Sequence, residues 1–91
     1  MRPVAAALLF LLAGCGDKPP TIIDGSSQEA FERTTAEARR DLPDADRIVY
    51  DRALRTVGGR HHGHPDPEAL ARVTFDGMTA AQVVEDARAR D

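Results

Sequence analysis

The apolar residues of this 91-residue chain are distributed so unevenly that little material remains for a core. Hydrophobic residues make up 42% of the sequence, but 12 of the 38 fall in the first fifteen positions. Of the 26 that remain, 11 are alanine, which leaves 15 larger apolar side chains for the following 76 residues. A chain of this length forms one small domain at most. These counts exclude a large enzyme with a cofactor-binding domain.

Residues 1–14 have the features of a signal peptide. Arg2 and the terminal amine supply a positive start, and residues 4–13 form an unbroken run of ten apolar residues. As a helix, such a run spans about 15 Å, which is half of a hydrocarbon core of about 30 Å. We therefore interpret it as the apolar region of a cleaved signal peptide rather than as a membrane span.

The signal peptide leads into the sequence Leu-Ala-Gly-Cys at residues 12–15, which resembles a bacterial lipobox. The resemblance implies cleavage between Gly14 and Cys15 and a diacylglyceryl group on the Cys15 thiol. The alternatives are a chance cysteine after an ordinary signal and a buried N-terminal helix. Cys15 is the only cysteine, so an intrachain disulfide is impossible. Two or three acyl chains on Cys15 form a stable anchor, whereas one chain holds weakly.

The residues after the cysteine indicate where the anchored chain is delivered and how it is held. Gly16 does not match the aspartate that retains lipoproteins in the inner membrane of enteric bacteria. We therefore expect the outer membrane, with the body facing the periplasm and the inner membrane as the alternative. Residues 15–25 are predicted to be the lipidated cysteine and a flexible tether, because two consecutive prolines favour an extended chain. Ile22 and Ile23 are too apolar for a pure linker, so we expect one of them to pack on the body.

The body, residues 26–91, is predicted to be an all-α bundle of three to four short helices. A capping-box pattern, Ser26 with Glu29, starts the first helix, and the chain turns at Pro43. The second helix spans residues 44–57 and stops at two glycines. Its broad apolar face is expected to comprise Ile48, Val49, Ala53, Leu54 and Val57.

Two shorter helices are expected after residue 60. Asp66 is a plausible cap for residues 68–73, with Pro67 in the first turn, although a strand at residues 73–75 is an alternative. After a turn at residues 76–77, Thr79 and Gln82 form a second capping-box pattern. The last helix ends near Arg90. Its N-terminal staple residues are Met78 and Val83, and its inward residues are Val83, Val84 and Ala87.

Charged residues indicate solvated helix faces rather than a binding site. From Cys15 onward the chain holds 11 basic and 15 acidic residues, a net charge of −4. Opposite charges stand four positions apart in four pairs, each worth a few tenths of a kcal/mol: Glu29–Arg33, Asp51–Arg55, Glu68–Arg72 and Asp86–Arg90. The sequence has no basic cluster with interleaved aromatic residues, which argues against nucleic-acid binding.

A loop rich in histidine is the one local candidate for metal chemistry. His61, His62 and His64 offer imidazole nitrogens to Zn²⁺ or Cu²⁺, with Asp66 as a further oxygen donor. Adjacent histidines rarely bind one ion without strain, and the sequence has no second ligand cluster. A solvent-exposed flexible loop is therefore the favoured interpretation.

We do not expect catalysis. Ser26 and Ser27, the two serines of the chain, stand at a helix start where capping accounts for them. A body with 15 larger apolar residues can hardly enclose a substrate pocket of about 300 Å³ and still form a core. Tyr50 and Phe75 are the aromatic residues most open to a binding role, although packing in or beside the core is favoured for both.

Three segments together resemble a family of small bacterial lipoproteins known only as a domain of unknown function. They are the lipobox at residues 12–15, IDGSSQEAF at residues 23–31, and FDGMTAAQVV at residues 75–84. The resemblance implies a lipoprotein with a helical body, and it implies no activity, because none is assigned to that family.

The leading hypothesis is a lipid-anchored envelope protein whose body binds another envelope component or acts as a spacer. Its only non-protein group is the covalent lipid on Cys15. The alternative is an envelope-tethered metal-binding module that uses His61, His62 and His64. Because small cores barely offset the entropy of ordering the chain, we also expect a marginal monomer or association with a partner or a second copy.

Overall fold

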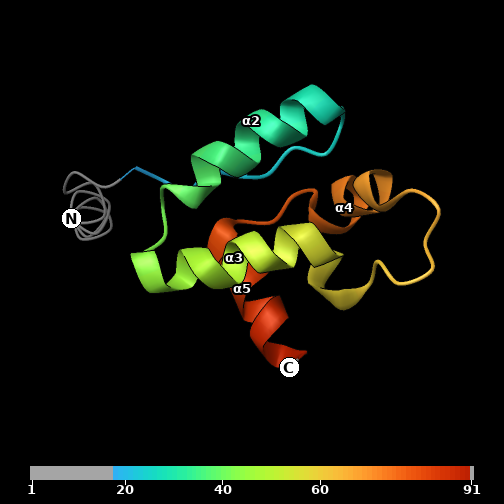
Figure 1. The fold of residues 1–91 in the computed structure, drawn as a ribbon. Helices are drawn as coiled ribbons and strands as arrows, with labels where there is room; N and C mark the ends of the chain where they lie inside the picture. The colour runs from blue at the N-terminus through green and yellow to red at the C-terminus, as the bar shows by residue number, and fades with distance from the viewer. Residues whose placement is uncertain (1–17, 91) are drawn as a thin grey trace, which may run out of the picture.

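The computed structural model describes residues 18–90, and the regular secondary structure of this part of the chain is entirely helical (Figure 1). Four α-helices follow one another with one short 3₁₀ turn: α2 (Gln28–Arg39), α3 (Asp44–Thr56), η1 (Val57–Gly59), α4 (Pro67–Phe75) and α5 (Ala80–Ala89). The all-α prediction is therefore confirmed. The alternative strand at residues 73–75 is wrong, because these residues form the last turn of α4.

Side-chain caps start three of the helices. Asp66 accepts from the Ala69 amide at 3.1 Å before α4, as predicted. At α5 both bonds of the capping box form: the Gln82 amide donates to Thr79, and the Thr79 amide donates to the Gln82 side chain. The cap of α2 is Ser27 rather than Ser26, since the Ser27 hydroxyl accepts from the Ala30 amide at 3.0 Å.

Helix α3 ends at Thr56, and one residue, Val57, separates it from the two glycines. Val57 adopts the left-handed conformation, with φ 53° and ψ 42°, and is almost completely buried. That conformation costs a β-branched residue about 1–2 kcal/mol. Burial of the Val57 side chain contributes about 1.5–3 kcal/mol and offsets this strain.

The core lies where α3 crosses α5 and is closed by α2 and α4 (Figure 1). Its largest fully buried side chains are Tyr50 and Phe75, and the remaining members are mostly alanine and valine. The Tyr50 hydroxyl donates to the Thr35 carbonyl oxygen at 2.7 Å, so its polar atom is satisfied inside the core.

Ile48 was expected on the inward face of α3, and this prediction is wrong. Its side chain is 73% exposed, whereas Tyr50, Ala53 and Val57 are buried. Five positions separate Ile48 from Ala53, which places them about 140° apart around a helix. The buried face is therefore centred on Tyr50 and turns Ile48 to solvent.

Residues 21–25, which we call the strap, lie in extended form across the body. The Ile23 amide donates to the Met78 carbonyl oxygen and the Gly77 amide donates to the Ile23 carbonyl oxygen, both at 2.8 Å. Ile23 is 1% exposed and belongs to the core, while Ile22 is 53% exposed. The prediction that one of these isoleucines packs on the body is confirmed. The flexible tether does not extend to residue 25, because the strap is already part of the domain.

Gly25 is needed where the strap meets α4. A Cβ atom at this position would overlap the backbone carbonyl oxygen of Arg72. The Gly25 amide also donates to the Asp76 carboxylate at 2.8 Å. The absence of a side chain thus permits a close approach of two backbones that are far apart in the sequence.

Candidate functional site

The site with the strongest sequence signal, Cys15 with Gly14, lies outside the described residues, as does the whole predicted signal peptide. Within residues 18–90, every helix is too short or too polar to cross a membrane. The side chains described below are therefore those of the strap and the helical body.

The histidine loop is not arranged as a metal centre. His61 Nδ1 donates to the Thr56 carbonyl oxygen at 3.1 Å, and its ring packs on that of His62 with centroids 4.5 Å apart. His64 Nδ1 instead accepts from the Asp66 amide at 3.1 Å. Throughout residues 18–90, no three His, Cys, Asp or Glu side chains are grouped so that they could hold a metal ion. The predicted ligand set is therefore not brought together here, because two of its three rings face local backbone groups.

The aromatic candidates for binding are committed to packing. Tyr50 and Phe75 are both fully buried, so neither offers a surface to a partner. Burial also raises the pKa of Tyr50 far above its ordinary value. The favoured prediction, that these rings pack in the core, is confirmed.

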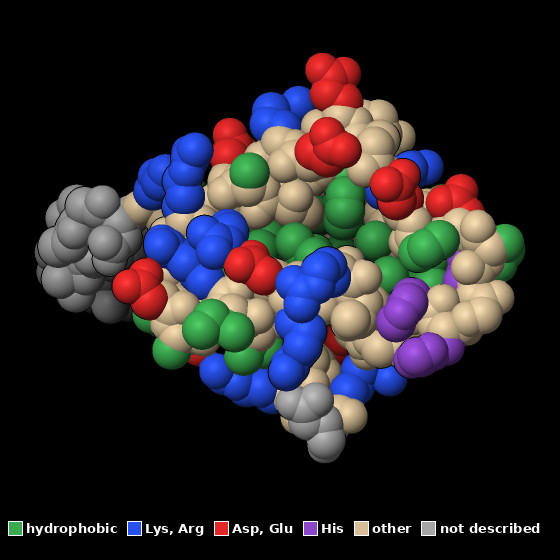
Figure 2. All heavy atoms as spheres, viewed as in Figure 1, with side chains coloured by type: hydrophobic (Ala, Val, Ile, Leu, Met, Phe, Trp, Pro, Cys, Tyr) green, Lys and Arg blue, Asp and Glu red, His purple; other side chains and the backbone are tan. Residues whose placement is uncertain are grey.

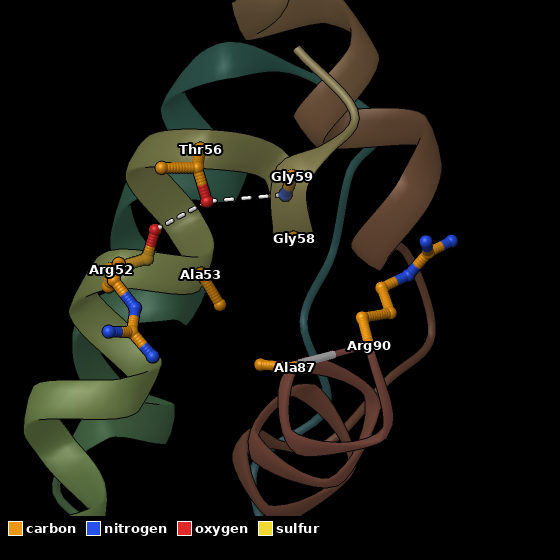
Figure 3. Close-up of a pocket in the computed structure, with 7 residues that line it drawn as sticks. All are labelled: Arg52, Ala53, Thr56, Gly58, Gly59, Ala87 and Arg90. Carbon is orange, nitrogen blue, oxygen red and sulfur yellow. Dashed lines mark hydrogen bonds between the residues drawn. The ribbon is translucent and has the colours of Figure 1, made fainter. Parts of the chain in front are cut away.

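A small cavity of about 140 Å³ lies between the C-terminal ends of α3 and α5 (Figure 3). Ala53 and Ala87 line it from the two helices, with Arg52 and Arg90 at its sides and the backbone of residues 58–59 at one end. Thr56 donates to the Arg52 carbonyl oxygen and accepts from the Gly59 amide, so its hydroxyl is already used.

The polar groups around this cavity come from the C-terminal ends of two helices. The carbonyl groups at a helix C-terminus carry partial negative charge, which favours cationic side chains such as Arg52 and Arg90. The volume holds a few water molecules but falls well below the roughly 300 Å³ of typical small-molecule sites. No sequence pattern could have indicated the cavity, since its walls come from helices that are paired only in the folded state.

Beside the cavity, Arg60 and Asp86 form the most enclosed ion pair of the body. Arg60 donates to both carboxylate oxygens at 3.1 Å, and Arg90 stands 3.7 Å from the same group. The hydrogen bonds from Arg60 hold the pKa of Asp86 below its ordinary value. A Cβ atom on Gly58 would come within 2.6 Å of the Arg60 guanidinium, which would have to shift, and the φ of +63° at this position favours glycine.

Only one of the four predicted helical ion pairs, Asp86–Arg90, forms within residues 18–90. Partners from other helices replace two of the rest. Arg39 of α2 reaches Asp51 with two hydrogen bonds of 2.8 and 2.9 Å, and Arg72 donates to Gln28. A bidentate contact from a neighbouring helix is favoured over a single contact four positions away. The prediction from four-residue spacing failed because it considers only charges within one helix and not those on neighbouring helices.

Acid should weaken the fold through these carboxylates. Since the pKa of Asp86 is lower in the folded than in the unfolded chain, the ion pair stabilises the folded state above about pH 4, the ordinary range of aspartate. That contribution is lost as the pH falls through the lowered pKa. We expect Arg60→Gln to flatten the dependence of the melting temperature on pH between about 2 and 5. Arg90→Gln, which removes the weaker contact, is the control and should leave the dependence nearly unchanged.

Two shallower depressions lie elsewhere on the surface of residues 18–90. One, of about 210 Å³, lies at the junction of α2, α3 and α4 and includes Phe31, Leu54 and Ala71. Hydrophobic side chains are visible along this junction in Figure 2. The other is a broad, open hollow along α5, lined by Gln82 and Glu85 among others. The hollow along α5 also includes Asp86, whose carboxylate accepts hydrogen bonds from Arg60.

Comparison with protein families identifies a match. The model of a family of unknown function, DUF6694, matches residues 3–61. The matched region contains the apolar run, Cys15, the strap, α2 and α3, and it stops before α4. Comparison with curated proteins and with solved structures gives no match.

Proposed function

The chain belongs to DUF6694, a family of unknown function, and from that premise we propose that it is a lipid-anchored lipoprotein of the bacterial cell envelope. The helical body is, in this proposal, a non-catalytic module that binds another envelope component or acts as a spacer. The observation that carries the proposal is the order of features in residues 1–15: Arg2, the apolar run, two small residues and Cys15. This order is the one that lipoprotein processing requires.

The extent of the family match supports this proposal. The match begins at residue 3, so the family shares the apolar leader as well as the helices. A leader that belongs to the family pattern is expected if delivery to the envelope is part of the function. Gly16 after the cysteine favours the outer membrane, with the body in the periplasm.

The chemistry of the body supports a role without catalysis. Ser27 is engaged as a helix cap, and Tyr50 is buried with its hydroxyl bonded to backbone. The cavity between α3 and α5 is small, and its polar wall groups belong to helix ends. A binding or spacing role does not need these polar side chains to be released from their hydrogen bonds, whereas catalysis by them would.

Intact-mass spectrometry of the protein extracted from bacterial membranes tests the proposal. We expect a chain that lacks residues 1–14 and carries a diacylglyceryl group on Cys15. Fragmentation should locate the added mass on the first residue of the mature chain. A chain cleaved elsewhere, or one whose Cys15 thiol still reacts with a maleimide, would contradict the lipid anchor.

A further inference from the structure

The strap determines where the anchor leaves the body. The Thr21 amide donates to the Asp41 carboxylate at 2.9 Å, which ties the start of the strap to the connection between α2 and α3. Figure 1 shows the N-terminal segment joining the molecule at this end, while the loop after η1 and helix α4 lie at the opposite end. Any group attached to Cys15 is therefore connected to the end of the body formed by α2 and α3.

The free part of the linker is short. Only residues 16–20 separate Cys15 from Thr21, because the strap is bound to the body from residue 21 onward. Six residue steps span at most about 20 Å when fully extended. A flexible chain of that length has a mean span of about 13 Å. A lipid on Cys15 thus keeps Thr21 close to the headgroup region, which is itself about 5–7 Å thick on each side of the bilayer.

The surface at this end carries exposed isoleucine side chains. Ile48 is 73% exposed in the second turn of α3, and Ile22 follows directly after Thr21. Arg47 donates to the carbonyl oxygens of Arg39 and Arg40, which fixes the start of α3 against the end of α2. The isoleucine of α3 is therefore held rigidly beside the point where the anchor leaves.

The charges at this end are compatible with a lipid surface. Within residues 18–90, Lys18 and Arg40 are exposed and form no ion pair. Three nearby carboxylates are paired with arginine, Asp44 with Arg47, Asp46 with Arg88 and Asp51 with Arg39, whereas the exposed Asp41 accepts from the Thr21 amide and forms no ion pair within residues 18–90. Figure 2 shows basic side chains at this end with acidic side chains among them and hydrophobic side chains beside them. Unpaired basic groups next to an exposed aliphatic group are typical of protein surfaces that contact phospholipid headgroups.

We infer that the α2–α3 end of the body lies against the bilayer surface, with Ile48 in the headgroup region and Lys18 and Arg40 at the lipid phosphates. This orientation rests on the proposed lipid anchor. Beyond the anchor itself, it specifies which face of the body contacts the membrane. The loop after η1 and helix α4 point away from the bilayer and are presented to the periplasm.

Site-specific labels on the lipidated protein test this orientation. Because Cys15 is the only cysteine and is consumed by lipid, a cysteine introduced elsewhere is the single free thiol. Ile48→Cys and Val73→Cys form a matched pair, since the native side chains are 73% and 77% exposed and neither belongs to the core. Arg72, next to Val73, contacts Gln28 at the start of α2, about 18 Å along that helix from the α2–α3 end.

Each variant is labelled with an environment-sensitive fluorophore and reconstituted into vesicles of phosphatidylethanolamine and phosphatidylglycerol that contain a quencher on the headgroup. We expect the label at position 48 to be quenched several-fold more than the label at position 73. Equal quenching, with both variants floating with the vesicles, would overturn the orientation but leave the anchor intact. Protein that fails to float with the vesicles would instead overturn the anchor, and the orientation with it.

Discussion

Replacing Cys15 with alanine is expected to abolish acylation of the protein completely. In cells grown with an alkyne analogue of palmitate, the native chain should carry the label and Cys15→Ala should carry none. The reason is chemical: the thiol sulfur is the nucleophile that accepts the diacylglyceryl group, and the chain holds no other cysteine. Labelling is read by coupling a fluorophore to the alkyne after immunoprecipitation.

Surface contact alone could not replace this anchor. Full burial of Ile48 contributes about 2 kcal/mol, and Lys18 and Arg40 contribute about 1 kcal/mol each near an anionic surface. The sum, about 4 kcal/mol, corresponds to a dissociation constant near 1 mM. Each buried methylene of an acyl chain contributes about 0.8 kcal/mol, so two chains exceed the surface contact several times over.

The matched control for this experiment is Gly16→Ala, which leaves the thiol and the residues before it unchanged. It should be labelled like the native chain. Equal labelling of Cys15→Ala and the native chain would show that the lipobox resemblance is misleading. Residues 1–15 would then act as an ordinary leader or as part of the folded protein.

The elements predicted well from sequence are those governed by neighbours in the chain. The caps Asp66 and Thr79 act within a few residues of their own helix, and both formed as expected. The start of α3 and the number of helices likewise depend on proline and glycine residues that start or end a helix locally. Even here the local rule missed by one position at the start of α2, where the cap is Ser27 and not Ser26.

Features that depend on the meeting of distant segments could not be predicted. Nothing in the strap sequence indicates that Ile23 pairs with Met78, more than 50 positions away. The replacement of the Asp51–Arg55 pair by Arg39–Asp51 has the same origin, since it requires α2 and α3 to be packed side by side. For the candidate sites, the histidine loop was located correctly as a loop, but the orientation of each ring is set by the backbone around it.

A substitution in the strap is expected to have a large effect on stability. Ile23→Ala removes a side chain that is 1% exposed and leaves a cavity against the core, at a cost of about 2–5 kcal/mol. A domain of about 70 residues has a total stability of about 4–10 kcal/mol. We therefore expect the melting temperature of the soluble fragment 16–91 to fall by about 10 °C or more, measured by circular dichroism at 222 nm.

Ile22→Ala provides the matched control, because it makes the same chemical change one residue earlier, at a side chain that is 53% exposed. Its effect should stay within about 0.5 kcal/mol, as for most surface substitutions. A large difference between the two variants requires that the strap is docked as residues 21–25 show, with the body beginning at Thr21. Similar small effects for both would mean that the strap detaches from the body in solution. The linker would then lengthen to ten residues, and the membrane could no longer be held against the α2–α3 end.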